Sequence, residues 1–455
     1  MARLNRFKAV IAAAIPVTLM AAMPWQAASA GVFNPETFTL SNGMQVVVIP
    51  NHRAPVVTHM VWYKVGAADK PKGKSGIAHM FEHLMFKATR RLKSGEFSKI
   101  VARNGGRDNA FTSQDYTAYH QTVAVDRLEI VMRLEADRMR GLILDKKEIE
   151  TERQVVLEER RSRTGNSPGA RLAEQFNAAF FLNHPYQKPI IGWEHEIKAI
   201  TQKDLKAFYN KWYLPNNAIL VVAGDITAKE LRPLAIKYYS LIPSGKVPER
   251  ARPSEPPHEA ARRVELRDAR VRQPSWRRRY LAPSLGSGKR SQVYPLQVLA
   301  QIFGGGATSR LYRALVIDRQ IAISAGAYYD GDAMGPTGFT IFASPRPGTS
   351  MDALETAVEE EIAKLTSTSV SAEDVARAKR SMRASAVYAR DSARGGARAL
   401  GAALASGQTI EDVESWPERI GAVTREQINR AARSVLVTKS SVTGLLLSGK
   451  KRRGN

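Results

Sequence analysis

The stretch GIAHMFEHLMF, residues 76–86, places three polar side chains inside an otherwise apolar run. The apolar spacing suits a helix, which is expected over 76–88. His79 and His83 are four residues apart, so on a helix both imidazoles project from one face and can share a metal ion. Glu82 lies on nearly the same face, close enough to act on a water molecule at the metal without being a ligand. The stretch therefore predicts a metal site.

A metal site on this helix needs a third protein ligand and an open position for water. A second helix, expected over 146–163, contains EIETERQVVLEE at 148–159, and the residues alone leave the choice among its carboxylates open. The order His-x-x-Glu-His is the inverzincin signature of zinc sites. The alternative, that His79 and His83 are ordinary core residues, is opposed by Glu82 at the matching offset. The other histidines are expected to be core or surface residues: His52, His59, His120, His184, His195 and His258.

The N-terminal segment, 1–30, has the composition of a secretory signal peptide. Three basic residues precede an apolar run over 9–23, and Ala28-Ser29-Ala30 has the small-x-small form of a cleavage site. Because the run is shorter than the roughly 20 residues that span a bilayer, no stable membrane span is expected after cleavage. An uncleaved N-terminal anchor is the alternative. Export is therefore predicted, with a bacterial periplasm as the expected location.

Charge and cysteine content limit the classes of function. The formal net charge is +25, and removing the segment 1–30, which carries +3, leaves 25 − 3 = +22. The arginines are spread along the chain and no nucleic-acid motif is present, so a solvated basic surface that favours acidic or anionic partners is expected, and not nucleic acid. The chain has no cysteine, which excludes disulfides and thiol redox chemistry.

Length and an internal repeat predict two similar halves. A chain of 455 residues exceeds what one hydrophobic core usually organises. A helix start at Thr201 leads to an apolar strand at Ala218, and the same order recurs at Thr424 and Val442, at nearly equal offsets (424 − 201 = 223 and 442 − 218 = 224). The predicted organisation is a signal peptide over 1–30, an N-terminal domain over 31–242, a proline-rich linker over 243–261, a C-terminal domain over 262–449 and a basic tail over 450–455.

The order of the expected elements predicts an α+β fold. In the first half, strands are expected at 44–50, 56–65 and 218–223, with helices at 76–88, 126–140 and 146–163. In the second half, strands are expected within 264–282 and 321–343 and at 442–447. Helices are expected there at 291–303, 308–316, 351–366 and 372–394.

These residues resemble the pitrilysin-type zinc metallopeptidases, a family that includes the mitochondrial processing peptidase. In that family the third zinc ligand is a glutamate at a characteristic distance beyond the second histidine, at the end of a Glu-Arg-x-Val-x-x-x-Glu context. Here that context starts at Glu152 and ends at Glu159, and the interval from His83 (159 − 83 = 76) matches the family's. The resemblance implies zinc held by His79, His83 and Glu159, with Glu82 as the catalytic base. It also implies that Glu152 supports the site without being a ligand, although a plain surface ion pair is the alternative for Glu152.

The resemblance covers residues 34–449 and implies more than the zinc site. It implies two homologous α/β-roll domains of about 210 residues each, forming a clamshell. The segment NGGRDNAFT at 104–112 resembles the edge strand of the family, whose backbone pairs with extended substrate. Asn109, Ala110, Phe111 and Thr112 are therefore candidate substrate-binding residues, with a purely structural strand as the alternative. The implied activity is zinc-dependent endopeptidase cleavage of unfolded or short peptides.

One departure from the family concerns the oxyanion. Members with a complete site carry an arginine and a tyrosine, at a fixed spacing, that bind the substrate carbonyl. Val316 and Ile323 occupy those positions here, and neither can donate a side-chain hydrogen bond. In some bacterial relatives the zinc motif and the Arg/Tyr pair are on different subunits. The resemblance therefore implies the zinc-bearing subunit of a heterodimer with a homologous partner, or a homodimer. The alternative is a non-catalytic peptide-binding or assembly subunit with a structural zinc site.

Overall fold

The computed structural model describes residues 31–250 and 252–449, so the predicted signal peptide and basic tail lie outside the described residues. The chain divides into Met1–Gly31, of which only Gly31 is described, and one compact unit, Val32–Asn455. Within the described ranges, no helix is long and apolar enough to cross a membrane.

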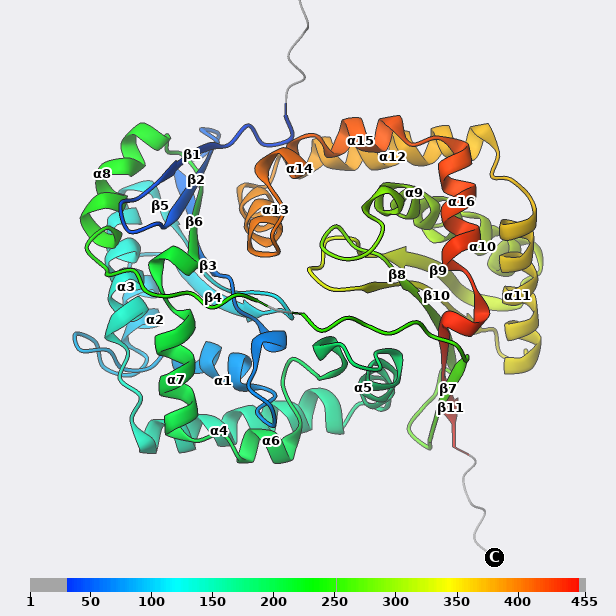
Figure 1. Cartoon of the computed structure of the whole chain (residues 1–455), viewed down its shortest axis with the longest axis horizontal. Helices are drawn as coiled ribbons and strands as arrows, with labels where there is room; N and C mark the ends of the chain where they lie inside the picture. The colour runs from blue at the N-terminus through cyan, green and yellow to red at the C-terminus, as the bar shows by residue number, and fades with distance from the viewer. Residues whose placement is uncertain (1–30, 251, 450–455) are drawn as a thin grey trace, which may run out of the picture. The chain divides into compact units, whose positions relative to one another are not determined.

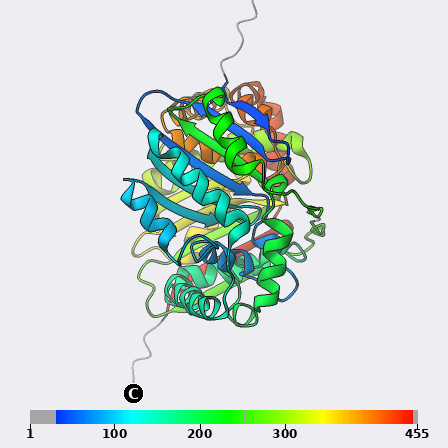
Figure 2. The same ribbon diagram turned by 90° about the vertical axis from the view of Figure 1, so that its left-hand side faces the viewer.

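The first half of the compact unit is built on a six-stranded sheet in the order β1-β2-β6-β3-β5-β4 (Figure 2). Its strands are β1 (Glu36–Thr39), β2 (Gln45–Pro50), β3 (Val56–Tyr63), β4 (Arg107–Thr112), β5 (Thr117–Ala124) and β6 (Ala218–Gly224). β6 is buried along its whole length, as expected for an apolar strand between two others. β4 is the last strand of the sheet and pairs only with β5, so its other edge is open within the described ranges.

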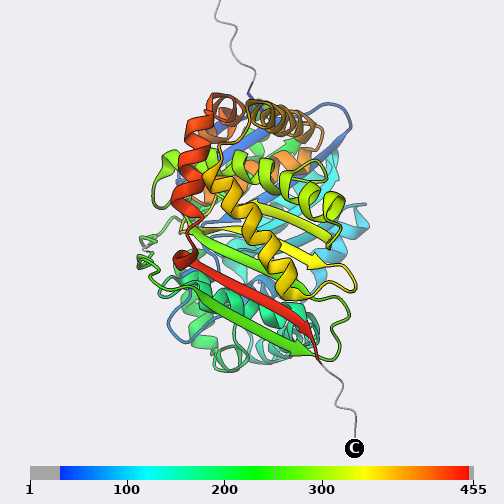
Figure 3. The same cartoon turned by 90° about the vertical axis from the view of Figure 1, so that its right-hand side faces the viewer.

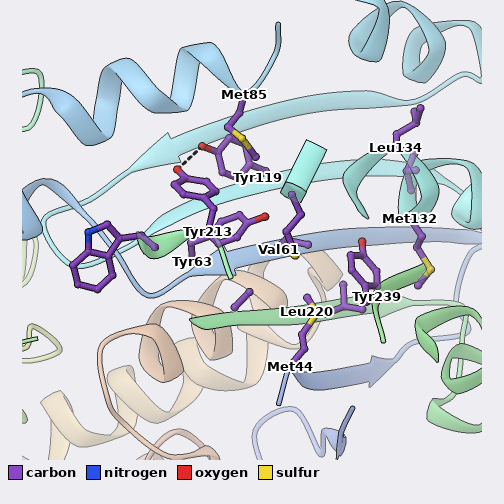
Figure 4. Close-up of a cluster of buried hydrophobic side chains, with 14 of the residues drawn as sticks. Met44, Val61, Tyr63, Met85, Tyr119, Met132, Leu134, Tyr213, Leu220 and Tyr239 are labelled. Carbon is purple, nitrogen blue, oxygen red and sulfur yellow. Dashed lines mark hydrogen bonds between the residues drawn. The ribbon is translucent and has the colours of Figure 1, made fainter. Parts of the chain in front are cut away.

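Helices of the first half cover one face of this sheet and enclose its main core. They are α1 (Ile77–Leu84), α2 (Glu96–Arg103), α3 (Leu128–Gly141), α4 (Lys146–Arg160), α7 (Gln202–Trp212) and α8 (Ala228–Tyr239). Two further helices of this half lie elsewhere: α5 (Pro168–Phe180) packs on β-strands of the second half, and α6 (Glu194–Lys198) packs on α4. The core includes Tyr63, Tyr119 and Tyr213, whose rings lie together (Figure 4). The hydroxyls of Tyr119 and Tyr213 share a 2.9 Å hydrogen bond, so these buried phenols keep a polar partner.

The second half is built on a five-stranded sheet in the order β7-β11-β8-β10-β9 (Figure 3). Its strands are β7 (Arg262–Asp268), β8 (Ser275–Ala282), β9 (Ala322–Tyr329), β10 (Thr337–Pro345) and β11 (Ser441–Ser448). The helices are α9 (Val293–Gly304), α10 (Arg310–Tyr312), α11 (Met351–Ser367), α12 (Ala372–Ala389), α13 (Ala393–Ala405), α14 (Ile410–Glu414), α15 (Trp416–Ala422) and α16 (Arg425–Val435). The mixed α/β architecture agrees with the predicted class.

The two sheets repeat one topology. β6 lies between a parallel neighbour, β2, and an antiparallel one, β3; β11 lies in the same way between β7 and β8. The helices before β6 and β11 both start at a threonine in a capping box, Thr201 and Thr424. The capped helix and following strand that repeat in the sequence therefore occupy equivalent places in the two sheets.

Each half also lends a helix to the sheet of the other half (Figure 1). α13 follows the second-half strands β7–β10 in the chain, but its Leu400 and Leu404 pack on the face of the first sheet opposite α1, against residues such as Trp62. α5 belongs to the first half, and its Phe176 packs with Val442 of β11. A serine caps the N-terminus of both lent helices, and these two helices join the halves into one unit.

Several expected helices are interrupted. The helix expected at 146–163 ends at Arg160 and continues as a π-helical turn, Arg161–Gly165; a second such turn, Arg313–Asp318, follows α10. The helix expected at 372–394 ends at Ala389, because the side chain of Ser392 caps a new helix by accepting from the Gly395 amide.

Candidate metal centre

The N-terminus of α1 is fixed by a close backbone crossing. Gly76 and Gly192 both have a left-handed backbone, with φ of 86° and 90°. A Cβ at Gly76 would lie 2.4 Å from the carbonyl oxygen of Ile191, and one at Gly192 would lie 2.4 Å from that of Ser75. Only glycine fits at either position, so the segment around 191–193 locks the start of the helix.

The apolar side of α1 anchors the helix in the core. Ile77, Met80, Phe81 and Leu84 are at most 1% exposed, and the ring of Phe81 packs on Tyr213. Since these residues face inward, the polar residues of the same short helix are directed towards α4 and β4.

Three potential metal ligands converge from α1 and α4. One ligand atom from each of His79, His83 and Glu159 lies within 4.8 Å of the others. Oε2 of Glu159 lies 3.7 Å from Nε2 of His79 and 3.2 Å from Nε2 of His83. The structure thus brings together the two histidines and the distal glutamate that the sequence singled out.

Glu152 holds one of these histidines in place. It is 5% exposed, one of its oxygens is 2.9 Å from Nδ1 of His83, and the other is 2.5 Å from the ammonium of Lys87. This geometry directs Nε2 of His83 towards the cluster. Glu152 is therefore buried, and it contacts both His83 and Lys87.

Glu82 lies beside the cluster and is oriented by the edge strand. Its carboxylate accepts a 2.5 Å hydrogen bond from the hydroxyl of Thr112 in β4. Glu82, the three-residue cluster and all four candidate substrate residues, Asn109–Thr112, line one hollow of about 680 Å³. The candidate base and the open edge of β4 therefore share one space.

The surroundings of the cluster shift the pKa values of its titratable groups in different directions. Burial raises the pKa of Glu82. Burial, with the neighbouring His83, lowers the pKa of His79 to about 4. Burial would lower the pKa of His83 as well, but hydrogen bonds to Glu152 and Glu159 outweigh burial and raise it to about 9. The hydrogen bond from His83 lowers the pKa of Glu159, while that of Glu152 is lowered because its bonds to His83 and Lys87 exceed the effect of burial.

The donor set fits zinc. Two imidazoles and one carboxylate are a usual protein set for a catalytic zinc ion, and they leave a fourth position open. The carboxylate is held in its ionised form, and His79 is neutral at neutral pH. In the described part of the chain this is the one group of three or more potential ligands close enough to share an ion.

Two cationic residues at the site were missed from the sequence. Lys87 bonds Glu152, and a guanidinium nitrogen of Arg163 is 2.6 Å from Oε1 of Glu159. Lys87 follows His83 by four residues and Arg163 follows Glu159 by four, so helical spacing was the available signal.

The positions expected for the oxyanion pair do not contribute to this hollow. Val316 packs against the core of the second half, and Ile323 is 45% exposed on β9. Among the described residues, the hollow is lined only by positions 79–191. Within the described ranges, no group from the second half therefore lines the hollow of the cluster.

Two family models match this chain. Residues 45–194 match the family model described as insulinase (peptidase family M16), and residues 199–382 match the model described as peptidase M16 inactive domain. The second match covers much of the half that lacks the metal-binding motif.

Individual relatives extend along most of the chain. A zinc protease named PqqE from Helicobacter pylori is 36% identical over 325 residues, which are 70% of this chain and 72% of that protein. An uncharacterized zinc protease from Mycobacterium leprae is 29% identical over 418 residues, 88% of each chain. The crystal structure of a protease from Helicobacter pylori aligns with a TM-score of 0.84 and 31% identity, covering 90% of this chain and 99% of that one. The chain therefore belongs to peptidase family M16, and its relatives include bacterial zinc proteases.

Proposed function

We propose that this chain is a zinc-dependent endopeptidase that hydrolyses unfolded or short peptides. The observation that carries the proposal is the placement of Glu82 in the same hollow as the cluster of His79, His83 and Glu159. A structural zinc site needs no additional carboxylate beside its ligands, whereas hydrolysis needs a base at that place.

His79, His83 and Glu159 would hold the zinc ion. Bound zinc supplies Lewis-acid chemistry, which polarises a carbonyl and makes water more acidic. Glu82 takes a proton from the attacking water and delivers it to the leaving amine. The raised pKa of Glu82 suits both proton transfers, because a carboxyl group whose pKa is shifted towards neutral pH both accepts and returns a proton. Thr112 orients the carboxylate, and Glu152 fixes the imidazole of His83.

The substrate is proposed to bind as an added strand on β4. Its free edge offers backbone donors and acceptors along Asn109–Thr112, next to Glu82. Because strand addition needs an extended backbone, unfolded or short peptides are the substrates that this edge can accept.

We further propose that a homologous partner subunit completes the site with an Arg/Tyr pair in a heterodimer, or that a homodimer completes it with another donor in place of that pair. The positions of Val316 and Ile323, both outside the hollow, support this proposal. The proposed location is the periplasm after cleavage of the segment 1–30.

A second candidate is a non-catalytic peptide-binding or assembly subunit with a structural zinc site. It is favoured by the absence of a second-half donor at the hollow, within the described residues.

Assays of the zinc-loaded mature chain, alone and with homologous partner subunits, on an unstructured peptide test both candidates. Glu82→Gln should retain zinc and lose hydrolysis by about 10²–10⁴-fold, because general-base assistance is removed. Activity only with a partner supports the shared site. Activity of this chain alone contradicts the heterodimer and favours the homodimer. Full activity of Glu82→Gln contradicts the role of that residue. No activity in any combination favours the binding subunit.

A further inference from the structure

Three arginines border one face of β4. In β4, Thr112 bonds Glu82, so the even-numbered side chains face α1 and the metal centre. Phe111 lies on the opposite face, where its ring packs on Trp62. By the same alternation, Arg107 and Asn109 share that opposite face, and both are exposed.

α13 brings two more arginines to this face. The guanidinium of Arg398 lies over the ring of Phe111, 4.6 Å from its centroid. A guanidinium nitrogen of Arg394 lies 3.3 Å from Nε2 of His120, the residue that pairs with Asn109 across the sheet. Both arginines are exposed.

No carboxylate neutralises these charges in the part of the chain that the structure describes. No ion pair is found there for Arg107, Arg394 or Arg398. Asp108, the acidic residue of β4, accepts a hydrogen bond from Ser98 of α2, on the metal-centre face. Asp391, three residues before Arg394, pairs with Arg53.

The charges of these arginines also affect the pKa of the neighbouring His120. Burial, followed by Arg394 and Arg398, lowers the pKa of His120 to about 4, and Asp108 opposes this only in part. His120 is therefore neutral at neutral pH, and the positive charge on this face belongs to the arginines.

We propose that the preferred substrates are peptides with acidic side chains at alternate positions, held along β4 with those side chains towards Arg107, Arg394 and Arg398. A peptide that extends the sheet places every second side chain on the face of Asn109 and Phe111, about 4.5–5.5 Å from the opposite side chain of β4. Long arginine side chains reach across that distance and bind carboxylates through paired N–H donors. This inference rests on the proposed function, because it assumes a peptide paired with β4.

Three unstructured peptides of one sequence, differing only in glutamate, glutamine or lysine at the alternate positions, test the proposal. Cleavage by the zinc-loaded chain, with its partner where one is required, gives kcat/KM; fluorescence anisotropy with Glu82→Gln gives the Kd. The glutamate peptide should exceed the lysine peptide by about fivefold to tenfold in kcat/KM and in affinity. The ratio should shrink between about 0.05 M and 0.5 M salt, because the screening length falls to a few ångströms.

Variants assign the preference to these residues. Arg394→Glu with Arg398→Glu should invert the order of the peptides, and Arg394→Gln with Arg398→Gln should nearly abolish it. The matched control is Arg430→Glu with Arg433→Glu, an exposed pair on α16 without ion pairs among the described residues, which should leave the order unchanged. Near-ultraviolet circular dichroism checks that each variant is folded.

The outcomes separate this inference from the proposed function. Equal Kd and equal kcat/KM for the three peptides overturn the charge preference, while cleavage of all three retains the peptidase. A preference that survives Arg394→Glu with Arg398→Glu also overturns it. Absence of cleavage with a charge-dependent Kd retains the acidic-peptide surface and removes the peptidase.

Discussion

Replacing Glu152 with glutamine should weaken zinc binding without removing a ligand. Glu152 is buried, with one oxygen on the imidazole of His83 and the other on the ammonium of Lys87. Both partners donate hydrogen bonds to it. A glutamine keeps one acceptor and places an NH₂ group against the second donor. One charge-assisted bond is therefore replaced by two facing donors.

The expected size follows from that lost bond. A hydrogen bond to a charged group contributes about 1.5–3 kcal/mol. Replacing residues that orient metal ligands typically weakens metal affinity about tenfold to hundredfold, which corresponds to about 1.4–2.7 kcal/mol. The two ranges agree, so the Kd for zinc should rise by one to two orders of magnitude.

Competition with a chromophoric chelator at fixed pH measures this change. Glu150→Gln is the matched control, because Glu150 lies on the same helix, is largely exposed and bonds only Arg153 and Gln154 among the described residues. Its zinc Kd should equal that of the unmodified chain. Equal zinc Kd values for Glu152→Gln and Glu150→Gln, with both variants folded, would refute the orienting role of Glu152.

Two further predictions concern stability. Glu135→Leu should lower the free energy of unfolding in urea by about 3–5 kcal/mol, because it leaves the fully buried guanidinium of Arg138 without its carboxylate partner. Adding Arg138→Met should recover most of this loss. No recovery in the double variant would contradict the reasoning. Glu255 accepts from three backbone amides and His258, and these bonds outweigh burial and lower its pKa. The free energy of unfolding that Glu255 contributes should be fully present above about pH 4.3, which is the pKa of a glutamate in the unfolded chain. This contribution should be lost as the pH falls through the lowered pKa of Glu255 in the folded chain. Urea titrations should therefore show the deficit of Glu255→Gln shrinking in acid; a pH-independent deficit would contradict this.

Local spacing predicted much of the metal centre. The four-residue interval of His79 and His83 places both on one helical face, whatever surrounds the helix. Glu159 is different, because its distance from His83 along the chain carries no geometric information without a known relative. The residues alone left several carboxylates open, and the family resemblance selected the one that the structure places at the cluster.

Features that depend on long-range packing were not predictable from the sequence. The helix expected at 372–394 looked continuous, because nothing local shows that α13 packs on the first sheet. In the same way, the apolar residues of α5 indicate a buried face without indicating which sheet covers it. The cationic residues beside β4 were visible only as part of a dispersed basic composition, since two of them arrive on α13.

The exchange of helices between the halves also restricts how the molecule can move. Separating α13 from the first sheet would uncover Trp62 and its apolar neighbours, and separating α5 would uncover Val442, so each lent helix must travel with the sheet that it covers. The chain enters the two lent helices through its irregular segments, the π-helical turn Arg161–Gly165 before α5 and the break at 390–392 before α13. Any relative motion of the two sheets would therefore bend the chain at these two segments. The first of them carries Arg163, whose guanidinium bonds Glu159, so bending there would be felt directly by a proposed zinc ligand.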